Sequence, residues 1–404
     1  MLPIAIIGAG QAGVALAAKL RVLGCREEIR LFGAEPVLPY QRPPLSKKYL
    51  LGEITREQLY LRPENFYENA GIVLQTGSRV VDVDAAEKTI GLEDGKRLAC
   101  SAIAFCTGAE PIRLGREIGG DLAGVYPVRS IRDSEEMAEA FRPGAHVLIV
   151  GGGYIGLEAA AVAASRGLRV TLVEKAQRLL ARVACEETAA WFRALHESHG
   201  VEIRTGTGLV ELRGRAGHVS SAQLDDGDEI AIDFAIVGVG VRPNVALAQS
   251  AGVVIGNGIE VDAFGRTSVP GIFAAGDCAS FPWKGSRIRL ESVPNATEQG
   301  KTIALHINGK PKPYNALPWF WSDQYDLKLQ MAGLSQGYDQ VVIRGDLEHG
   351  RELTVFYLKE GRVLSLDCVN RPKDFMIGKK LIESEKQLDT IVLSNDAIDL
   401  GTLL

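Results

Sequence analysis

Six glycines in two similar strings have the spacing of a dinucleotide-phosphate site. The first string, residues 4–14, reads IAIIGAGQAGV, and the second, residues 147–160, reads VLIVGGGYIGLEAA. The GxGxxG glycines permit a tight turn, close approach of a pyrophosphate, and close packing of a helix on a strand. The N–H groups and partial positive charge of the helix N-terminus then attract phosphate. Two such strings predict two dinucleotide sites in one chain.

The residues that would surround the two dinucleotides follow from these strings. They are Gly8, Gly10, Ala12 and Gly13 in the first string, and Gly151, Gly153, Tyr154, Ile155 and Gly156 in the second. An acid after the next strand is expected to accept hydrogen bonds from the ribose hydroxyls. In the first unit this acid is Glu35, which follows Gly33 and Ala34, and in the second it is Glu174. A carboxylate at Glu174 would repel a 2′-phosphate, so it predicts NADH in preference to NADPH.

Short buried strands followed by helices must position these turns. Continuous apolar runs at Ile4–Ile7 and His146–Val150 are typical of strands buried on both faces of a parallel sheet. The following helices are expected over residues 14–22 and 159–164, and the next strands over residues 28–32 and 169–173. This alternation predicts an α/β fold with two Rossmann-like units.

Two dinucleotides in one chain are most simply a tightly held flavin, FAD, and a visiting nicotinamide, with hydride passing between them. The far end of FAD should then meet chain that returns to the first domain. The string GIFAAGD, residues 271–277, fits such a return, and Asp277 after Gly276 would accept hydrogen bonds from the ribityl chain. A helix with proline in its first turn is expected from residue 292, and its dipole would stabilise negative charge on the reduced ring.

Composition restricts the class of protein. A chain of 404 residues exceeds one ordinary core, so two or three domains are expected. The content of 46% hydrophobic residues, with 45 basic and 50 acidic ones, indicates a soluble globular protein that binds no nucleic acid. Short apolar runs predict no membrane span, and a strand that begins almost at Met1 predicts no signal peptide. Six cysteines without CxxC spacing suit the cytoplasm and predict no metal site.

Four longer strings carry a family resemblance over nearly the whole chain. They are PPLSKKYL (43–50), ESVPNATEQ (291–299), PWFWSDQYD (318–326) and VNRP (369–372). Together with both glycine turns, Thr107-Gly108 and Gly276-Asp277, they resemble the NADH-dependent ferredoxin reductases of bacterial oxygenase systems. This family includes the putidaredoxin, biphenyl-dioxygenase ferredoxin and rubredoxin reductases, and its fold is glutathione-reductase-like. An acid often stands in the family where this chain has Ala34, which leaves Glu35 as the expected ribose ligand.

Three domains are expected from these assignments. The FAD-binding domain would comprise residues 1–109 and 242–318, with the NADH-binding domain, residues 110–241, inserted between them. Residues 319–404 would form a small α+β domain, with strands over 340–344, 353–358 and 363–369 and a helix over 377–385.

The distribution of cysteines limits the route of electrons out of the flavin. Disulfide reductases of the wider superfamily pass electrons to a CxxxxC pair after the first glycine turn, but this chain has no cysteine from residue 26 to 99. Electrons must therefore leave the flavin directly, for a quinone, for oxygen, or for a one-electron carrier. The resemblance favours an acidic 2Fe–2S ferredoxin that docks transiently and feeds a monooxygenase or dioxygenase.

Several site residues are implied by the resemblance alone. Lys47 would pair with Glu158 beside flavin N5, where a cation favours the anionic reduced ring, and Tyr154 would cover the flavin face until nicotinamide displaces it. Trp321 would wall the ring, and Arg129 would reach the flavin nucleotide. The further implied contacts are Arg42, Val80, Thr107, Gly108 and Val293 for FAD and Gly240 for NADH.

The favoured function is thus an enzyme that takes hydride from NADH onto FAD and passes single electrons to a ferredoxin. The alternatives are an NADH oxidase or quinone reductase, and an NADH-sensing flavoprotein that binds a partner. For the favoured function, a basic rim would steer the acidic ferredoxin. Its candidate residues are Arg287, Arg289, Lys301, Lys310, Lys312 and Lys328.

Overall fold

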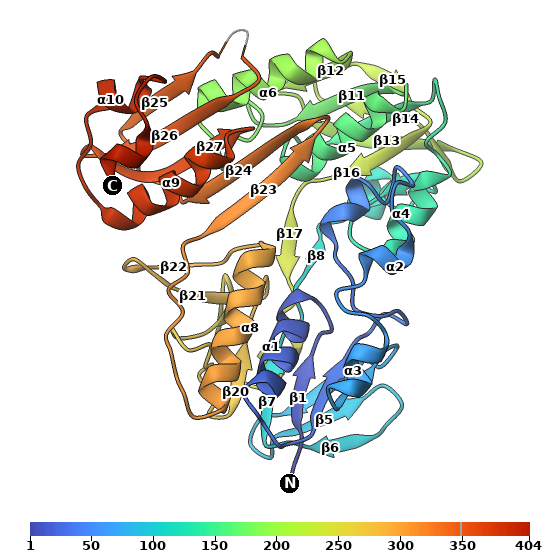
Figure 1. Ribbon diagram of the computed structural model, residues 1–404. Coiled ribbons are helices and arrows are strands. Elements are labelled where there is room, and N and C mark those ends of the chain that lie inside the picture. Colours follow the sequence, from blue (N-terminus) through green and yellow to red (C-terminus); the bar gives the residue numbers. More distant parts are fainter. Residues whose placement is uncertain (348–349) are drawn as a thin grey trace. The chain divides into compact units, whose positions relative to one another are not determined.

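The computed structural model describes residues 1–347 and 350–404 and divides into two compact units (Figure 1). The first unit comprises residues 1–41, 55–110 and 241–318, and the second comprises residues 42–54, 111–240 and 319–404. Residues 42–54, assigned by prediction to the FAD-binding domain, pack in the second unit with residues 111–240 and 319–404. Which cofactor each part binds stays a prediction. Among the described residues, no helix has the length and apolar character needed to cross a membrane.

A parallel five-stranded sheet forms the centre of the first unit. Its order is β20-β7-β1-β2-β3, with β1 (Ile4–Ile7), β2 (Ile29–Phe32), β3 (Ile72–Gln75), β7 (Ala102–Phe105) and β20 (Ile272–Ala274). Every residue of β1 is buried because the strand lies between β2 and β7 and is covered on both faces. The return strand β20 joins the edge of this sheet beside β7, as expected from the string at residues 271–277.

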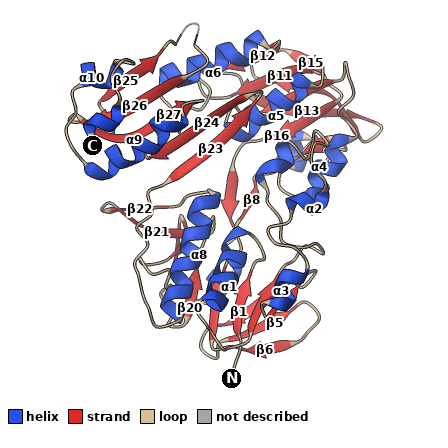
Figure 2. Cartoon of the chain, in the orientation of Figure 1, coloured by secondary structure: helices blue, strands red, loops and turns tan. Residues whose placement is uncertain are grey.

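Two helices of the first unit, α1 (Gln11–Val22) and α8 (Val293–Ile307), pack side by side on this sheet (Figure 2). A small residue is needed where they meet, because a Cβ at Gly300 would lie 2.5 Å from the carbonyl oxygen of Ala12. Ala12 therefore serves helix packing in addition to its place in the glycine turn. The helix predicted from residue 292 is α8, which begins at Val293 with Pro294 in its first turn.

The other helices and strands of the first unit and its boundary are short. The helices are α2 (Arg56–Leu59), α3 (Asn65–Asn69) and α7 (Ala246–Ser250). The strands are β4 (Val80–Asp84), β5 (Thr89–Leu92), β6 (Arg97–Ala99), β8 (Ala109–Pro111), β17 (Val241–Pro243), β18 (Ile255–Gly256), β19 (Gly258–Glu260), β21 (Ala279–Trp283) and β22 (Ser286–Ile288). They form three small sheets beside the parallel one: β4-β5-β6, β17-β8 and β18-β19-β21-β22.

A second parallel sheet, of order β12-β11-β10-β16-β9, carries the second glycine turn. Its strands are β9 (Val125–Tyr126), β10 (His146–Val150), β11 (Arg169–Glu174), β12 (Val201–Thr205) and β16 (Phe234–Val237). The helices are α4 (Ile131–Ala138), α5 (Tyr154–Ser165) and α6 (Glu186–Ser198), with the 3-10 helices η1 (Pro43–Ser46) and η2 (Arg116–Ile118). A ribbon of β13 (Leu209–Arg215), β14 (His218–Leu224) and β15 (Glu229–Ala231) completes this part.

The C-terminal residues form an antiparallel sheet of order β23-β24-β27-β26-β25. Its strands are β23 (Trp319–Gln324), β24 (Leu327–Gly333), β25 (Gln340–Gly345), β26 (Leu353–Lys359) and β27 (Arg362–Val369), followed by α9 (Pro372–Ser384), α10 (Thr390–Ser394) and η3 (Leu400–Leu403). One hydrophobic core joins this sheet to the parallel sheet of the same unit, with Leu329 and Val355 beside Val147 and Ile149. Leu50 enters the same core, which explains why residues 42–54 belong to this unit.

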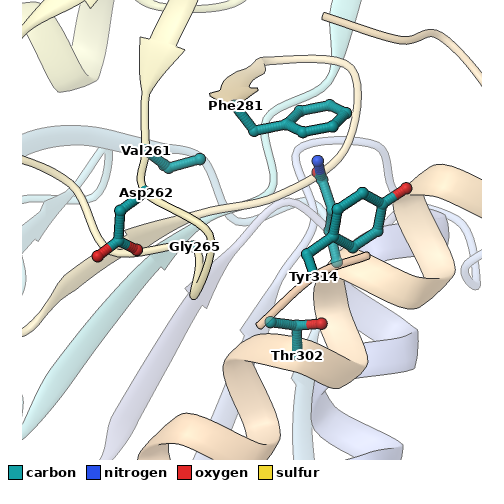
Figure 3. Close-up of a pocket in the computed structure, with 7 residues that line it drawn as sticks. Val261, Asp262, Gly265, Phe281, Thr302 and Tyr314 are labelled. Atoms are coloured by element: carbon teal, nitrogen blue, oxygen red, sulfur yellow. The ribbon is translucent and has the colours of Figure 1, made fainter. Parts of the chain in front are cut away.

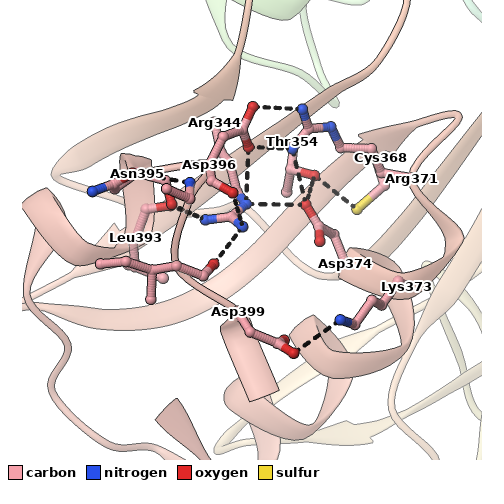
Figure 4. A network of polar contacts seen from close by, with 12 residues as sticks. Arg344, Thr354, Cys368, Arg371, Lys373, Asp374, Leu393, Asn395, Asp396 and Asp399 are labelled. Atoms are coloured by element: carbon pink, nitrogen blue, oxygen red, sulfur yellow. Dashed lines mark hydrogen bonds and ion pairs between the residues drawn. The ribbon is translucent and has the colours of Figure 1, made fainter. Parts of the chain in front are cut away.

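A buried arginine fixes the end of the chain to the C-terminal sheet (Figure 4). The Arg344 guanidinium donates to the carbonyl oxygens of Asn395 at 2.6 Å and Ile398 at 2.7 Å. It also pairs with Asp374 at 3.3 Å and Asp396 at 3.2 Å. A buried charge needs such partners, so these contacts hold the last residues in one place.

The predicted fold class, α/β with two Rossmann-like units and a C-terminal α+β part, is confirmed. The strand expected at His146–Val150 coincides with β10, and those over residues 28–32 and 169–173 agree with β2 and β11 within one residue. The C-terminal helix differs, because it begins at Pro372 and not at residue 377. The fixed φ of proline favours the first helical turn, and here it sets the start.

Candidate functional site

The first glycine turn is built so that only glycine fits at two of its three positions. Gly8 has φ +114°, and a Cβ there would lie 2.1 Å from the carbonyl oxygen of Cys106. A Cβ at Gly13 would lie 2.1 Å from the carbonyl oxygen of Gly8. A Cβ at Gly10 would instead have no described atom within 4 Å. The turn is thus closed toward the sheet and open in front of α1, where a phosphate would bind.

The second glycine turn repeats this construction. Gly151 has φ +110°, and a Cβ added there would lie 2.5 Å from the carbonyl oxygen of Gly238. A Cβ added at Gly156 would lie 2.0 Å from the carbonyl oxygen of Gly151. A Cβ at Gly153 would meet no described atom within 4 Å. Neither α1 nor α5 has an acid in its first turn or a capping side chain among the described residues. Both helix N-termini therefore fit the phosphates of a dinucleotide.

The two predicted ribose ligands lie at the ends of the second strands. The Glu174 carboxylate accepts a hydrogen bond from the Gly152 amide through Oε2 and one from the Ala176 amide through Oε1, both at 2.7 Å. These bonds fix the carboxylate at the rim of the second glycine turn. Glu35 is half-buried and accepts a hydrogen bond from the Tyr40 hydroxyl at 2.6 Å, whereas Ala34 is exposed. A carboxylate can accept about four hydrogen bonds, so the two described for Glu174 leave lone pairs for a ribose.

The return to the first sheet places Asp277 directly after a turn that glycine makes in the left-handed conformation. Gly276 has φ +83° and donates its N–H to Gln299 Oε1 at 2.8 Å. Asp277 is half-buried beside it. The Thr107 hydroxyl donates to the carbonyl oxygen of Asn244 at 2.7 Å. In return, the Asn244 side-chain amide donates to the carbonyl oxygen of Thr107 at 3.0 Å. The sequence prediction missed Asn244 and Gln299, which hold Thr107 and Gly276 in place.

A small cavity of about 10 Å³ lies beside Gln299 in the first unit (Figure 3). It is lined by Val261, Asp262, Gly265, Phe281, Gln299, Thr302 and Tyr314. Nε2 of Gln299 is buried without a hydrogen-bond partner among the described residues. The cavity has room for about one water molecule, which would satisfy this amide, and it is too small for a dinucleotide.

Lys47 and Glu158 form a buried ion pair in the second unit. Lys47 Nζ lies 2.8 Å from Glu158 Oε1 and 3.6 Å from Asp323 Oδ2. Glu158 follows Gly156 by two residues in α5, and Lys47 directly follows η1. Burial raises the pKa of Glu158, and the Lys47 ammonium opposes this. The ion pair implied by the resemblance is present, and its place beside a flavin stays a prediction.

Two serine hydroxyls, which the sequence prediction missed, complete the surroundings of Glu158. Ser322 Oγ donates to Glu158 Oε1 at 2.6 Å, and Ser46 Oγ donates to Glu158 Oε2 at 3.2 Å. The string PWFWSDQYD carries no signal of the contact with Glu158, only that of a strand. Had β23 been predicted there, the alternation of a strand would have put Ser322 and Gln324 on one face.

Tyr154 packs against the C-terminal sheet. Its hydroxyl lies 2.7 Å from Met331 Sδ, and its ring centroid lies 5.1 Å from that of Phe320. Burial raises the pKa of Tyr154 well above its usual range, so the hydroxyl stays protonated. Trp321 is half-buried with its ring 5.6 Å from Trp319. These contacts account for Tyr154 as a packing residue, and its role over the flavin face stays a prediction.

The remaining predicted residues fall in both units. Arg42 donates to the carbonyl oxygen of Arg129 at 2.6 Å, so these two lie together in the second unit. Val80 is buried at the start of β4, Gly240 has φ +109°, and Ile155 is exposed on α5. The residues predicted to bind FAD belong to both units. In the first unit they are Gly8, Gly10, Ala12, Gly13, Glu35, Val80, Thr107, Gly108, Gly276, Asp277 and Val293, and in the second they are Arg42, Lys47, Arg129 and Trp321. All predicted NADH residues belong to the second unit.

Two protein families match this chain, and they identify the class of enzyme to which the site belongs. The family described as pyridine nucleotide-disulphide oxidoreductase matches residues 2–300. The chain belongs to this oxidoreductase family. The family described as reductase C-terminal matches residues 319–404.

Individual members of the oxidoreductase family are similar over almost their whole length. A ferredoxin–NAD(P)(+) reductase of Sphingomonas sp is 43% identical, with 96% of this chain and 94% of the relative covered. The ferredoxin–NAD(+) reductase component of the p-cumate 2,3-dioxygenase system of Pseudomonas putida is 37% identical, with 98% and 97% covered. The reductase in the crystal structure of the covalent putidaredoxin reductase–putidaredoxin complex gives a TM-score of 0.96 at 37% identity, with 99% and 97% covered.

These similarities confirm the predicted relationship to ferredoxin reductases. They also confirm the predicted enzyme class, an oxidoreductase, and the cofactor types of the family, FAD and a nicotinamide dinucleotide. Both glycine turns fit such cofactors, because each leaves open space before a helix N-terminus that no described side chain caps.

The cysteines of this oxidoreductase offer no reactive thiol beside the first glycine turn. All six are free. Cys106 and Cys278 are buried, and burial raises the pKa of both thiols. A thiol held protonated is a poor nucleophile, so these two are structural residues and not redox relays.

Proposed function

We propose that this chain takes hydride from NADH onto FAD and passes single electrons to a 2Fe–2S ferredoxin that feeds an oxygenase. The observation that carries the proposal is the pair of glycine turns, each closed toward its sheet and open before a helix N-terminus. The first turn would hold FAD and the second NADH. The names of the relatives, which are reductases of ferredoxins or rubredoxins, support this choice of acceptor.

When bound, FAD supplies the change from two-electron to one-electron chemistry. The chain would bind it through the first glycine turn, Glu35 and Asp277, and would orient it through the Gly276 turn that Gln299 holds. Lys47, fixed by Glu158, would present a positive charge where negative charge develops on reduction. We further place the enzyme in the cytoplasm, because all six cysteines are free thiols.

Cofactor preference provides one test of this assignment. Glu174→Ala removes the carboxylate that Gly152 and Ala176 hold at the rim of the second turn. We expect the preference for NADH over NADPH, measured as the ratio of kcat/KM values, to fall by about 10-fold or more, since a buried hydrogen bond to a charged group contributes about 1.5–3 kcal/mol. Glu187→Ala, which removes an acid from the first turn of α6, serves as the control. An unchanged ratio in Glu174→Ala would remove this residue from ribose recognition.

Electrostatic steering of the ferredoxin provides a second test. Three candidate rim cations already have acidic neighbours, because Arg287, Arg289 and Lys301 pair with Glu260, Glu291 and Glu298, respectively. Lys310 and Lys312 are exposed after the end of α8, so these two lysines are the better candidates for steering the ferredoxin.

We therefore expect Lys310→Gln with Lys312→Gln to slow reduction of an acidic ferredoxin and to weaken its salt dependence. In the unmodified protein, raising the salt concentration should lower that rate by about 10-fold. Reduction of a small neutral dye by NADH should change little in either protein. Equal salt dependence for the dye and the ferredoxin would exclude steering by charge.

The function as a whole is tested by rapid mixing of the FAD-loaded protein with NADH, cytochrome c and ferredoxin. We expect NADH to bleach the flavin, and cytochrome reduction to become fast only when ferredoxin is added. Fast reduction of oxygen or quinone without ferredoxin would favour an oxidase or quinone reductase. Bleaching without transfer to any acceptor would favour an NADH-sensing protein.

A further inference from the structure

The Ser322 hydroxyl is the first member of a buried chain of hydrogen bonds that leads away from Glu158. Gln324 Nε2 donates to Ser322 Oγ at 3.2 Å, and Gln324 Oε1 lies 2.8 Å from His196 Nε2. His196 Nδ1 lies 3.0 Å from the Tyr325 hydroxyl. Ser322, Gln324 and His196 have exposed fractions of 0%, 1% and 0%. These three residues therefore lie in the interior of the second unit, and the chain ends at the half-buried Tyr325.

Every donor in this chain can point in one direction, toward Glu158. Ser322 donates to the carboxylate, and Gln324 donates to Ser322. Gln324 Oε1 must then accept from His196, so the proton of a neutral His196 lies on Nε2. Its bare Nδ1 accepts from the Tyr325 hydroxyl. Burial lowers the pKa of His196 to about 4, which agrees with a neutral ring.

A chain of aligned donors strengthens each of its bonds, and the end of this one is the Glu158 carboxylate. The amide of Gln324 interrupts proton transfer, since it can pass a proton only by becoming an imidic acid. The chain therefore orients and stabilises charge and does not conduct protons.

We propose that Ser322, Gln324 and His196 are positioning residues that hold the Glu158 carboxylate ionised and aimed at Lys47. This inference rests on the proposed function, in which Lys47 acts on the flavin. The titratable groups that face Glu158 are Lys47 from the segment after η1 and, through Gln324, His196 from α6. Asp323 of β23 faces Lys47, with its Oδ2 3.6 Å from Lys47 Nζ.

The sign of the pH dependence follows from the ionised state of Glu158. Burial raises the pKa of Glu158 above its usual range, and the Ser322 and Ser46 hydroxyls and Lys47 oppose this rise. Glu158 is ionised above its pKa and loses its hold on Lys47 as the pH falls through that value. The rate of flavin reduction by NADH should therefore decrease at low pH. Ser322→Ala should move this acid limb of the pH profile to higher pH.

The test is an infrared pH titration of the Glu158 carboxyl band in the FAD-loaded protein, with the band identified by its loss in Glu158→Gln. We expect Ser322→Ala to raise the titration midpoint by about one pH unit, the equivalent of one hydrogen bond to a charged group. Ser322→Thr keeps a hydroxyl and should restore most of the shift. His196→Leu should move the midpoint in the same direction by less.

The matched control is Ser365→Ala, which removes a buried hydroxyl of the same sheet that has no partner among the described residues. It should leave the midpoint unchanged. A Ser322→Ala midpoint equal to that of Ser365→Ala would overturn the positioning chain.

The pH profile of flavin reduction separates this inference from the proposed function. Suppose that Glu158→Gln leaves the acid limb of the pH profile in place while Ser322→Ala shifts the infrared midpoint. The hydrogen-bond chain is then supported, and the role of the ion pair in flavin reduction is excluded. Suppose instead that Glu158→Gln abolishes the acid limb while Ser322→Ala shifts neither the infrared midpoint nor the pH profile. The role of the ion pair in flavin reduction is then supported, and the positioning by the hydrogen-bond chain is excluded.

Discussion

Replacing Lys47 by alanine is expected to slow reduction of the bound flavin by NADH by about two orders of magnitude, the usual effect of losing a preorganised charge. The expectation follows from the 2.8 Å contact that fixes the ammonium on Glu158 and from its limited exposure, 12%. Stopped-flow measurement of flavin bleaching gives the rate directly. Lys48→Ala is the control, because the adjacent lysine is exposed.

Loss of Lys47 alone also leaves a carboxylate buried without its cation, which costs about 3–5 kcal/mol of folding free energy. The double variant Lys47→Met with Glu158→Gln removes both charges and should recover most of the thermal stability. It should not recover the rate of flavin reduction. If the double variant reduces its flavin as fast as the unmodified protein, the ion pair is structural and has no part in the reaction.

Adding one methyl group to each open glycine should separate the two cofactor sites. At Gly10 and Gly153 the new Cβ meets no described atom, and the φ values of −89° and −83° suit alanine. If dinucleotide phosphates occupy that space, overpacking by about 1–3 kcal/mol weakens binding about 5- to 150-fold. We expect Gly10→Ala to release FAD and Gly153→Ala to raise the KM for NADH with the FAD content unchanged.

The thermal stability of the cofactor-free protein provides the control for both variants. It should not fall, because alanine at a compatible φ removes freedom only from the unfolded chain. An increase in the KM for NADH from Gly10→Ala, or loss of FAD from Gly153→Ala, would mean that the first turn binds NADH and the second binds FAD. No change in either variant would mean that neither turn faces a phosphate.

The sequence was sufficient for the elements whose signals are local. Buried strands such as Ile4–Ile7 and His146–Val150 read as apolar runs, and the glycines after them mark turns that only glycine can make. The start of α9 at Pro372 was also a local signal, and it was overlooked because the apolar pattern begins later.

Contacts between distant segments could not be derived in this way. Ser322 meets Glu158 only because the C-terminal sheet packs on α5, and no pattern near residue 322 contains that information. The same is true of Leu50, whose burial in the core of the second unit moves residues 42–54 out of the first. Lys47 and Glu158 were paired by resemblance, since the 110 residues between them carry no physical signal of the contact.

The most direct test of the central claim is an anaerobic titration of the purified protein with NADH, followed through the flavin absorbance. The central claim is that the flavin receives hydride with no redox-active thiol beside it. It predicts that a single equivalent of NADH per FAD bleaches the flavin completely and that no further NADH is consumed. A colourless protein, a flavin that stays oxidised, or uptake of a second equivalent would contradict it.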